Sequence, residues 1–277
     1  MSQQQPNPQK RTAETHIDLN VPIDTVWKAL TDAGELTQWF PLAAAVKPGL
    51  GGSITNDFGG GAKFTAPIAI WEPNKHLRLL CCAPNTSEAD IVRIDYFLDD
   101  RGGGVTRLRL VHYGFSKDAA WDEMYDGVNR GWDAALWTLK YFLETRPGAQ
   151  RTVIYLSGKT TSATPDSWRR LFAAESLFPD ALYSAKQCDR FAFALGAERM
   201  NGVVRRNVAN KDFQLIVENM DGVLLRLQFD PARSGGCAAT LTLSTYGFDT
   251  GRIKLIETTW AAAMERALGG KVDVVHV

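Results

Sequence analysis

The chain has 277 residues, of which 45% are hydrophobic and 22% are charged, a composition typical of globular proteins. Its 31 lysine and arginine residues balance its 31 aspartate and glutamate residues, so the formal net charge is zero. That balance argues against a nucleic-acid-binding protein or a polybasic membrane protein, because both need excess positive charge. We therefore expect neither nucleic acid nor a membrane as a partner.

Residues 1–13 are rich in glutamine and proline, contain no apolar stretch and are expected to form a disordered tail rather than a signal peptide. No segment approaches the roughly 18 apolar residues that a membrane-spanning helix needs. The four cysteines show no C-x-x-C or Cys/His spacing, so the sequence predicts no disulfide framework, no metal site and no cofactor. These features favour a cytoplasmic protein.

The first half of the chain predicts a strand, two short helices and then a run of strands. The strands are predicted where apolar and polar residues alternate with a period of two, which is typical of antiparallel strands with one buried face. The expected elements are a strand at 16–19, a helix at 24–30, a helix at 34–40 and strands at 63–71, 77–81, 91–98 and 105–113.

A long amphipathic helix is predicted from Trp121 to Thr145, because its apolar residues recur at steps of three and four. One apolar stripe on a helix and one apolar face on a sheet must bury each other. The expected fold class is therefore α+β, with a curved antiparallel sheet wrapped around a long C-terminal helix.

The sequence also contains an internal repeat. The segment LRLVHYGF at 108–115 recurs as LTLSTYGF at 241–248, and NKHLRL at 74–79 recurs as NKDFQL at 210–215. The order is kept while the offset falls along the chain, as expected for a duplication whose second copy has shorter loops. We expect one domain at 14–146, a linker at 147–150, a divergent second domain at 151–270 and a C-terminal tail at 271–277.

Several motifs of the first copy resemble one protein family. They are Pro22 with 26–32 (VWKALTD), Leu36 with Trp39-Phe40, Gly51-Gly52, Glu72-Pro73, Gly104 with Thr106, and Gly131-Trp132. In this order they resemble the START/Bet v 1-like (SRPBCC) helix-grip superfamily, and within it the branch similar to the Hsp90 ATPase activator homologue. The resemblance implies two tandem helix-grip domains.

The resemblance also implies a cavity between sheet and long helix that holds an apolar small molecule. Strand alternation places a set of side chains on the inner face, opposite three residues of the helix. The candidate ligand-binding residues are Trp39, Phe64, Ile68, Ile94, Tyr96, Leu108, Leu110 and His112, with Trp132, Ala135 and Leu136 on the helix. The alternative is that most of them fill an ordinary core.

His112 and Tyr96 are the polar candidates on this apolar wall. His112 shares its strand parity with Leu108 and Leu110, and an inward imidazole can orient a ligand or move a proton near neutral pH. The alternative is a local hydrogen bond at the end of a strand. A buried Tyr96 hydroxyl also needs a partner. The counterpart of His112 in the repeat is Thr245, which cannot act as a base near neutral pH.

The second copy departs from the family pattern, because Thr259-Trp260 replaces Gly131-Trp132 and the Glu-Pro pair is missing. We therefore expect a hydrophobic small molecule to bind mainly in the first copy, without a complete catalytic set. The alternatives are an enzyme that uses His112 and Tyr96 on an aromatic or polyketide-like substrate, and a module that activates a chaperone ATPase. The sequence leaves the oligomeric state open, and an intramolecular pseudo-dimer of the two copies is one alternative.

Overall fold

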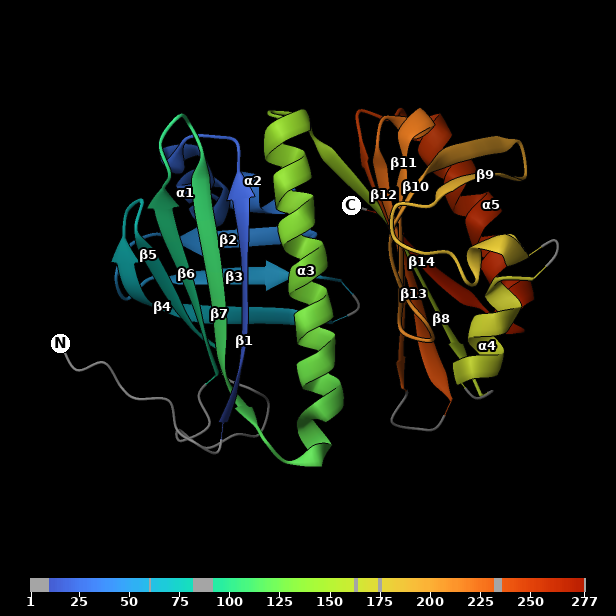
Figure 1. Cartoon of the computed structure of the whole chain (residues 1–277), viewed down its shortest axis with the longest axis horizontal. Coiled ribbons are helices and arrows are strands. Elements are labelled where there is room, and N and C mark those ends of the chain that lie inside the picture. The colour runs from blue at the N-terminus through green and yellow to red at the C-terminus, as the bar shows by residue number, and fades with distance from the viewer. Residues whose placement is uncertain are drawn as a thin grey trace. The chain divides into compact units, whose positions relative to one another are not determined.

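The computed structural model describes residues 10–59, 61–81, 92–161, 164–173, 176–231 and 236–276. The chain divides into two compact units, Met1–Ala149 and Gln150–Val277, and each contains a seven-stranded antiparallel sheet and one long helix (Figure 1). The chain is therefore α+β with two tandem helix-grip domains, as the sequence predicts.

The first unit follows the expected order of strand, short helices, strands and long helix. Its sheet has the strand order β1-β7-β6-β5-β4-β3-β2, so successive strands β2 to β7 form a meander and β1 joins at the far edge. The elements are β1 Lys10–Leu19, α1 Ile23–Thr31, α2 Ala33–Thr37, β2 Ala43–Lys47, β3 Ser53–Asp57, β4 Lys63–Glu72, β5 His76–Cys81, β6 Val92–Asp100, β7 Thr106–Ser116, a 3-10 turn Ala119–Trp121 and α3 Asp122–Thr145.

The second unit repeats this plan with one strand fewer in the meander and one strand more at the C-terminus. Its sheet order is β14-β8-β13-β12-β11-β10-β9. The elements are β8 Arg151–Thr160, α4 Thr164–Leu171, β9 Arg190–Leu195, β10 Glu198–Val208, β11 Asp212–Val217, β12 Val223–Pro231, β13 Cys237–Tyr246, α5 Thr250–Leu268 and β14 Val272–His276, with 3-10 turns Asp180–Leu182 and Glu218–Met220.

The same turn joins the equivalent strands β4–β5 and β10–β11. Asn74 and Asn210 both adopt the left-handed backbone conformation, with φ of 60° and 63°, which asparagine tolerates better than most residues. The carbonyl of the following lysine accepts the equivalent hydrogen bond from the next strand in each unit. Leu98 N of β6 donates to Lys75 O, and Phe229 N of β12 donates to Lys211 O, both at 2.9 Å. This shared detail supports the duplication seen in the sequence.

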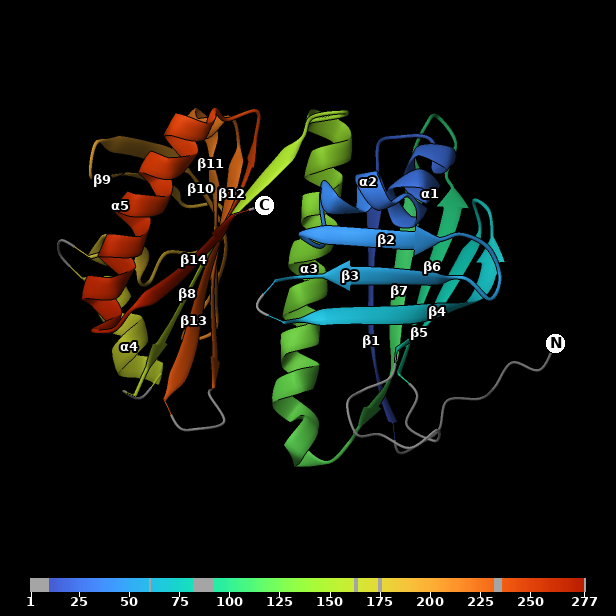
Figure 2. The same ribbon diagram turned by 180° about the vertical axis from the view of Figure 1, so that it is seen from behind.

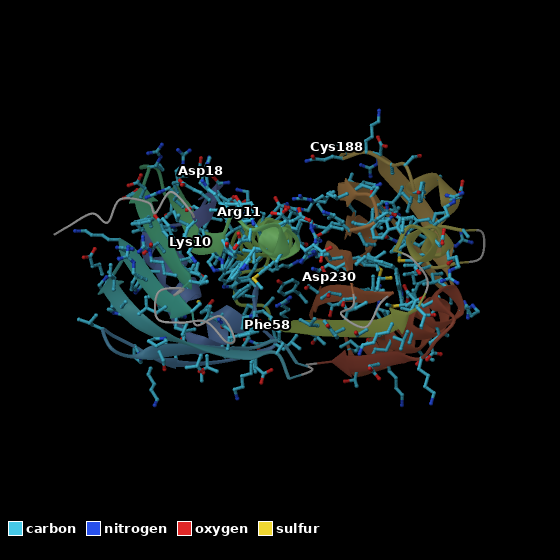
Figure 3. The ribbon with its side chains drawn as sticks, turned by 90° about the horizontal axis from the view of Figure 1, so that it is seen from below. Lys10, Arg11, Asp18, Phe58, Cys188 and Asp230 are labelled. Carbon is cyan, nitrogen blue, oxygen red and sulfur yellow. The ribbon has the colours of Figure 1, made fainter. Side chains whose placement is uncertain are left out.

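Helix α3 runs along β1, while β2, β3 and β4 cross the direction of β1 (Figure 2). Its side chains bind the carbonyl groups of this edge strand: Tyr125 Oη donates to Thr12 O at 3.0 Å, and Lys140 Nζ donates to Asp18 O at 2.7 Å. Arg11, labelled in Figure 3, pairs with Asp122 at the start of α3 at 2.5 Å. These contacts cover a strand edge that otherwise exposes unpaired backbone groups.

Two segments that were expected to be tails form edge strands of the sheets. Strand β1 begins at Lys10, inside the 1–13 segment expected as a tail, because it pairs with β7 from Lys10↔Ser116 onward. The segment 271–277 was expected as a C-terminal tail, but its residues Val272–His276 form β14 on β8. In the first unit, strands β2 and β3 were not predicted, and the second short helix ends at Thr37 rather than Phe40.

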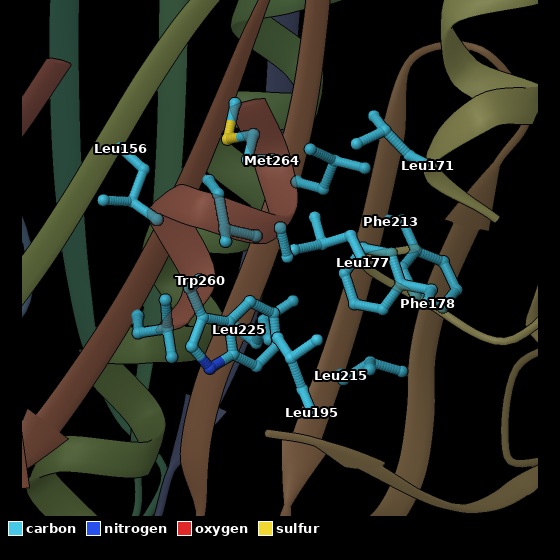
Figure 4. Packing of buried hydrophobic residues seen from close by; sticks show 14 of the residues in the cluster. Leu156, Leu171, Leu177, Phe178, Leu195, Phe213, Leu215, Leu225, Trp260 and Met264 are labelled. Carbon is cyan, nitrogen blue, oxygen red and sulfur yellow. The ribbon is translucent and has the colours of Figure 1, made fainter. Parts of the chain in front are cut away.

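The core of the second unit is densely filled by aromatic and branched side chains (Figure 4). Trp260 and Met264 of α5 pack toward the sheet and are 0% exposed, as are Phe213 and Leu215 of β11. Phe178 contacts the ring of Phe213 at 5.2 Å and that of Trp260 at 6.0 Å. Such packing is typical of a structural core.

On the outer face of the first sheet, three basic side chains surround the fully buried carboxylate of Asp95. Asp95 is 0% exposed, and its oxygens lie 2.7 Å from His76 Nε2 and 2.6 Å from Arg78 Nε. Arg93 Nε lies 3.8 Å away. Burial raises the pKa of Asp95, but hydrogen bonds from His76 and Arg78 more than offset it and hold the pKa below its ordinary value. This carboxylate therefore stabilises the fold at neutral pH, and the contribution is lost as pH falls through its lowered pKa.

We expect Asp95→Asn to lower the free energy of unfolding by about 3 kcal/mol, because it removes the buried charge that pairs with the partly buried His76, Arg78 and Arg93. Urea denaturation of the full chain at neutral pH measures this. Asp99→Asn is the matched control, since that side chain on the same strand is 72% exposed and should matter little. Equal stabilities of the two variants would contradict this role of Asp95.

Candidate functional site

His112 lies on β7 with its side chain in the interior of the first unit. Its Cα pairs with Ile94 on β6 and with Ala13 on β1, both of which are buried. His112 as a whole is 9% exposed. Because alternate residues of a strand share a face, His112 lies on the same apolar wall as Leu110, as the sequence predicts.

The indole of Trp132 fixes the tautomer of this imidazole. Trp132 Nε1 on α3 donates to His112 Nδ1 at 3.0 Å. An indole nitrogen is only a donor, so Nδ1 accepts and the neutral ring carries its hydrogen on Nε2. The Nε2 atom is buried and has no hydrogen-bond partner among the described residues. The site therefore presents one N–H donor whose hydrogen bond is unmade.

Burial also sets the protonation state of His112. It lowers the pKa from 6.5 to about 4, since the charged imidazolium loses its hydration in an apolar interior. The imidazole is therefore neutral at neutral pH. Because its Nε2 carries the hydrogen and Nδ1 is already bonded, the ring has no free lone pair with which to act as a base.

Tyr96 is the second polar side chain of the wall. It lies on β6 opposite Leu77 and Leu110, and it is 5% exposed. Its ring contacts that of Trp132 edge-on, with the centroids 6.1 Å apart. Burial raises the pKa of Tyr96 well above its ordinary value, so the phenol stays protonated. Its hydroxyl can donate or accept a hydrogen bond but carries no charge.

A continuous series of aromatic rings connects this site with the surface. Phe64 contacts Phe58 at 6.4 Å, Phe58 contacts Phe40 at 5.1 Å, and Phe40 stacks on Trp132 at 5.2 Å. We call these four residues the aromatic series; Phe58 is labelled in Figure 3. Phe64 is 55% exposed, whereas Trp132 is 7% exposed. The series therefore runs from solvent to His112.

The structure separates the sequence candidates into groups. Four of them, Ile68, Leu108, Leu110 and Leu136, are at most 2% exposed and belong to the core. Trp39 is also buried, and its Nε1 donates to Ala29 O at 2.9 Å, which anchors α1. Ala135 is half-buried, and Ile94 is 8% exposed beside His112. Tyr96, His112 and Trp132 are brought together.

Two expectations about the wall needed adjustment. Phe64 was expected to face inward, and it has the parity of Ala66 and Ile68, but it lies at the start of β4 and is exposed. Phe40 and Phe58 were not among the candidates, although they link Phe64 to Trp132. Phe58 follows β3 in phase with the buried Ile54, a parity signal that could have identified it.

The second unit does not reproduce the polar groups of the first. When the two units are aligned on the shared asparagine turn, His112 corresponds to Leu243. When they are aligned on the Tyr-Gly-Phe motif, His112 corresponds to Thr245. Thr245 Oγ1 donates to the Thr152 carbonyl at 3.1 Å. By the same two alignments Tyr96 corresponds to Leu227 or to Leu225, both 0% exposed. Neither alignment gives an ionisable side chain at these positions.

Among the described residues, no group of three or more His, Cys, Asp or Glu side chains is placed to hold a metal ion. In the same part of the chain, no helix is long and apolar enough to cross a membrane.

The family comparison matches most of the first unit. The family model described as Activator of Hsp90 ATPase homolog 1-like protein matches residues 20–144, which lie within the first unit. The first unit therefore contains a domain that matches this family model, and a second helix-grip domain follows it in tandem. The comparison with curated proteins gave no match.

Solved structures that resemble the chain include some that match half of it and some that match nearly all of it. The Aha1 dimer from Colwellia psychrerythraea is 22% identical, covers 50% of this chain and 99% of its own, and has a TM-score of 0.44. The di-domain ARO/CYC BexL of the BE-7585A biosynthetic pathway is 13% identical, with 94% and 96% covered and a TM-score of 0.44. DynU16 from the dynemicin biosynthetic locus is 15% identical, with 93% and 96% covered and a TM-score of 0.42.

The lowered pKa of His112 predicts a pH-dependent stability. The unfolded chain takes up the proton near pH 6.5, while the folded protein takes it up only at about 4. This stability is therefore complete above pH 6.5 and is lost as pH falls toward 4, by about 3 kcal/mol in total.

We expect His112→Gln to remove this part of the pH dependence, because an amide does not titrate. Urea denaturation at several pH values measures the slope for each protein. His16→Gln, at an exposed histidine of β1, is the matched control and should keep the slope of the unmodified chain. A slope unchanged in His112→Gln would mean that His112 titrates normally in the folded state.

Proposed function

We propose that the first unit binds a hydrophobic small molecule along the aromatic series, between the sheet and α3. The observation that carries this proposal is the path of rings from the exposed Phe64 to the buried Trp132 and His112. Apolar and aromatic linings with a few convergent polar groups are typical of small-molecule sites.

The energetics favour such a ligand. An exposed phenylalanine loses contact with water when an apolar molecule covers it, and each buried aromatic side chain brings a large apolar area. Phe64 is 55% exposed, and Phe58 and Phe40 are half-buried, so all three have surface left to cover. A flat or aromatic ligand gains stacking contacts on these rings in addition to burial.

The polar groups support binding rather than proton transfer. The free nitrogen of His112 carries a hydrogen, and its pKa of about 4 keeps the ring neutral. Tyr96 holds its proton because burial raises its pKa. A general acid or base works best when its pKa lies near the working pH, and neither group meets that condition. Both are better suited to orient a ligand.

The first unit is a better host than the second. In the second unit Trp260, the counterpart of Trp132 in the repeat, is 0% exposed and surrounded by fully buried residues. The inner positions of β12 are Val223, Leu225, Leu227 and Phe229, none more than 2% exposed. Because these side chains are buried in the core of the unit, they offer little surface to a ligand.

We expect the full chain to bind N-phenylnaphthylamine, an uncharged probe that fluoresces in apolar surroundings, at one saturable site per chain. Phe64→Ser should weaken this binding about fivefold, which corresponds to about 1 kcal/mol of lost apolar contact. Because Phe64 is exposed, the variant should keep its fold.

Leu50→Ser is the matched control, since Leu50 is 76% exposed in the turn between β2 and β3 and lies outside the aromatic series. It should bind the probe as the unmodified chain does. Absence of saturable binding, or equal affinities in Phe64→Ser and Leu50→Ser, would contradict the proposed site.

A further inference from the structure

We propose that His112 selects ligands with a hydrogen-bond acceptor oxygen, of the ketone or quinone type, by donating its Nε2–H to that oxygen. The inference rests on the proposed function, because it specifies which apolar molecules the first unit prefers. It assigns to His112 a role in specificity rather than in proton transfer.

The Nε2–H group of His112 lacks a hydrogen-bond acceptor among the described residues. His112 is 9% exposed, and its buried Nε2 has no partner among the described residues. A buried donor without an acceptor destabilises a protein by its full desolvation cost, so such atoms in native structures call for an explanation. A ligand oxygen at Nε2 would supply the missing acceptor.

The polarity of the site is fixed. Trp132 Nε1 can only donate, so it cannot pair with an Nδ1 that carries the hydrogen. The tautomer with the hydrogen on Nε2 is thereby enforced. Ligands that offer only a donor at this point meet a second N–H group and are disfavoured, whereas carbonyl oxygens are favoured.

The apolar and polar parts of the site meet at Trp132. Trp132 is both the innermost ring of the aromatic series and the hydrogen-bond partner of His112. A molecule stacked along the series toward Trp132 therefore approaches the imidazole. The ring of Tyr96 lies edge-on to the same indole, so a second polar side chain belongs to the same wall. This arrangement suits an aromatic ligand that carries one carbonyl group, with its oxygen as the hydrogen-bond acceptor.

The test compares two probes of the same shape, acetylnaphthalene and ethylnaphthalene substituted at the same ring position. Only the ketone offers an acceptor oxygen. Dissociation constants are measured from the quenching of tryptophan fluorescence in the full chain. In His112→Phe the preference for the ketone over the hydrocarbon should fall about tenfold relative to the unmodified chain, because a hydrogen bond of ordinary strength is lost. His112→Gln, which keeps an N–H donor, should retain part of the preference.

The outcomes separate this inference from the proposed function. If both probes bind but their ratio is the same in the unmodified chain and in His112→Phe, the role of His112 is overturned while the proposed function stands. If neither probe binds the unmodified chain, the proposed function itself fails.

A second measurement needs no variant, so it does not depend on the folding of His112→Phe. In full chain labelled with ¹⁵N-histidine, the NMR spectrum should show His112 as the neutral tautomer with its hydrogen on Nε2. The Nε2 signal should shift with acetylnaphthalene and stay unchanged with ethylnaphthalene. A hydrogen on Nδ1, or equal shifts with both probes, would overturn the inference.

Discussion

The hydrogen bond between Trp132 Nε1 and His112 Nδ1 is the contact on which the first unit's site depends. It joins α3 to β7 across the interior, where both partners are nearly buried. In so doing it fixes the imidazole tautomer and sets the rotation of the indole on which Phe40 stacks. Without it the aromatic series would lose its inner end, and the Nε2–H donor would have no defined direction.

Much of the fold was predictable because burial of one face imposes a period of two. Strands β4 to β7 and helix α3 carry that pattern or its helical equivalent. Strands β2 and β3 do not: Ala43–Lys47 contains three alanines, and no residue of β2 is fully buried. Strand β14 was missed because it is a five-residue edge strand whose place is set by pairing with β8. Such elements depend on tertiary contacts more than on local sequence.

The site was predictable in part. Parity placed His112 and Tyr96 on the inner wall, but it could not reveal that Trp132, twenty residues away from His112, donates to Nδ1. That bond depends on the rotation of α3 against the sheet, which periodicity does not specify. Phe40 follows the end of α2, where the helical pattern stops, whereas Phe58 keeps the parity of β3 one residue beyond its end and was overlooked. Phe64 is exposed because it lies at the second position of β4, where no helix or strand of the described residues covers its ring.

We propose an aromatic binding site with polar groups at its inner end in the first unit. In the second unit, side chains such as Trp260 and Phe213 fill the equivalent interior. The most direct measurement is a crystal structure of the full chain grown with acetylnaphthalene. The account predicts the ketone in the first unit, its rings against Phe40 and Trp132, and its oxygen about 2.7–3.2 Å from His112 Nε2. A ketone bound in the second unit, or an Nε2 bonded to a group of the protein itself, would contradict the claim.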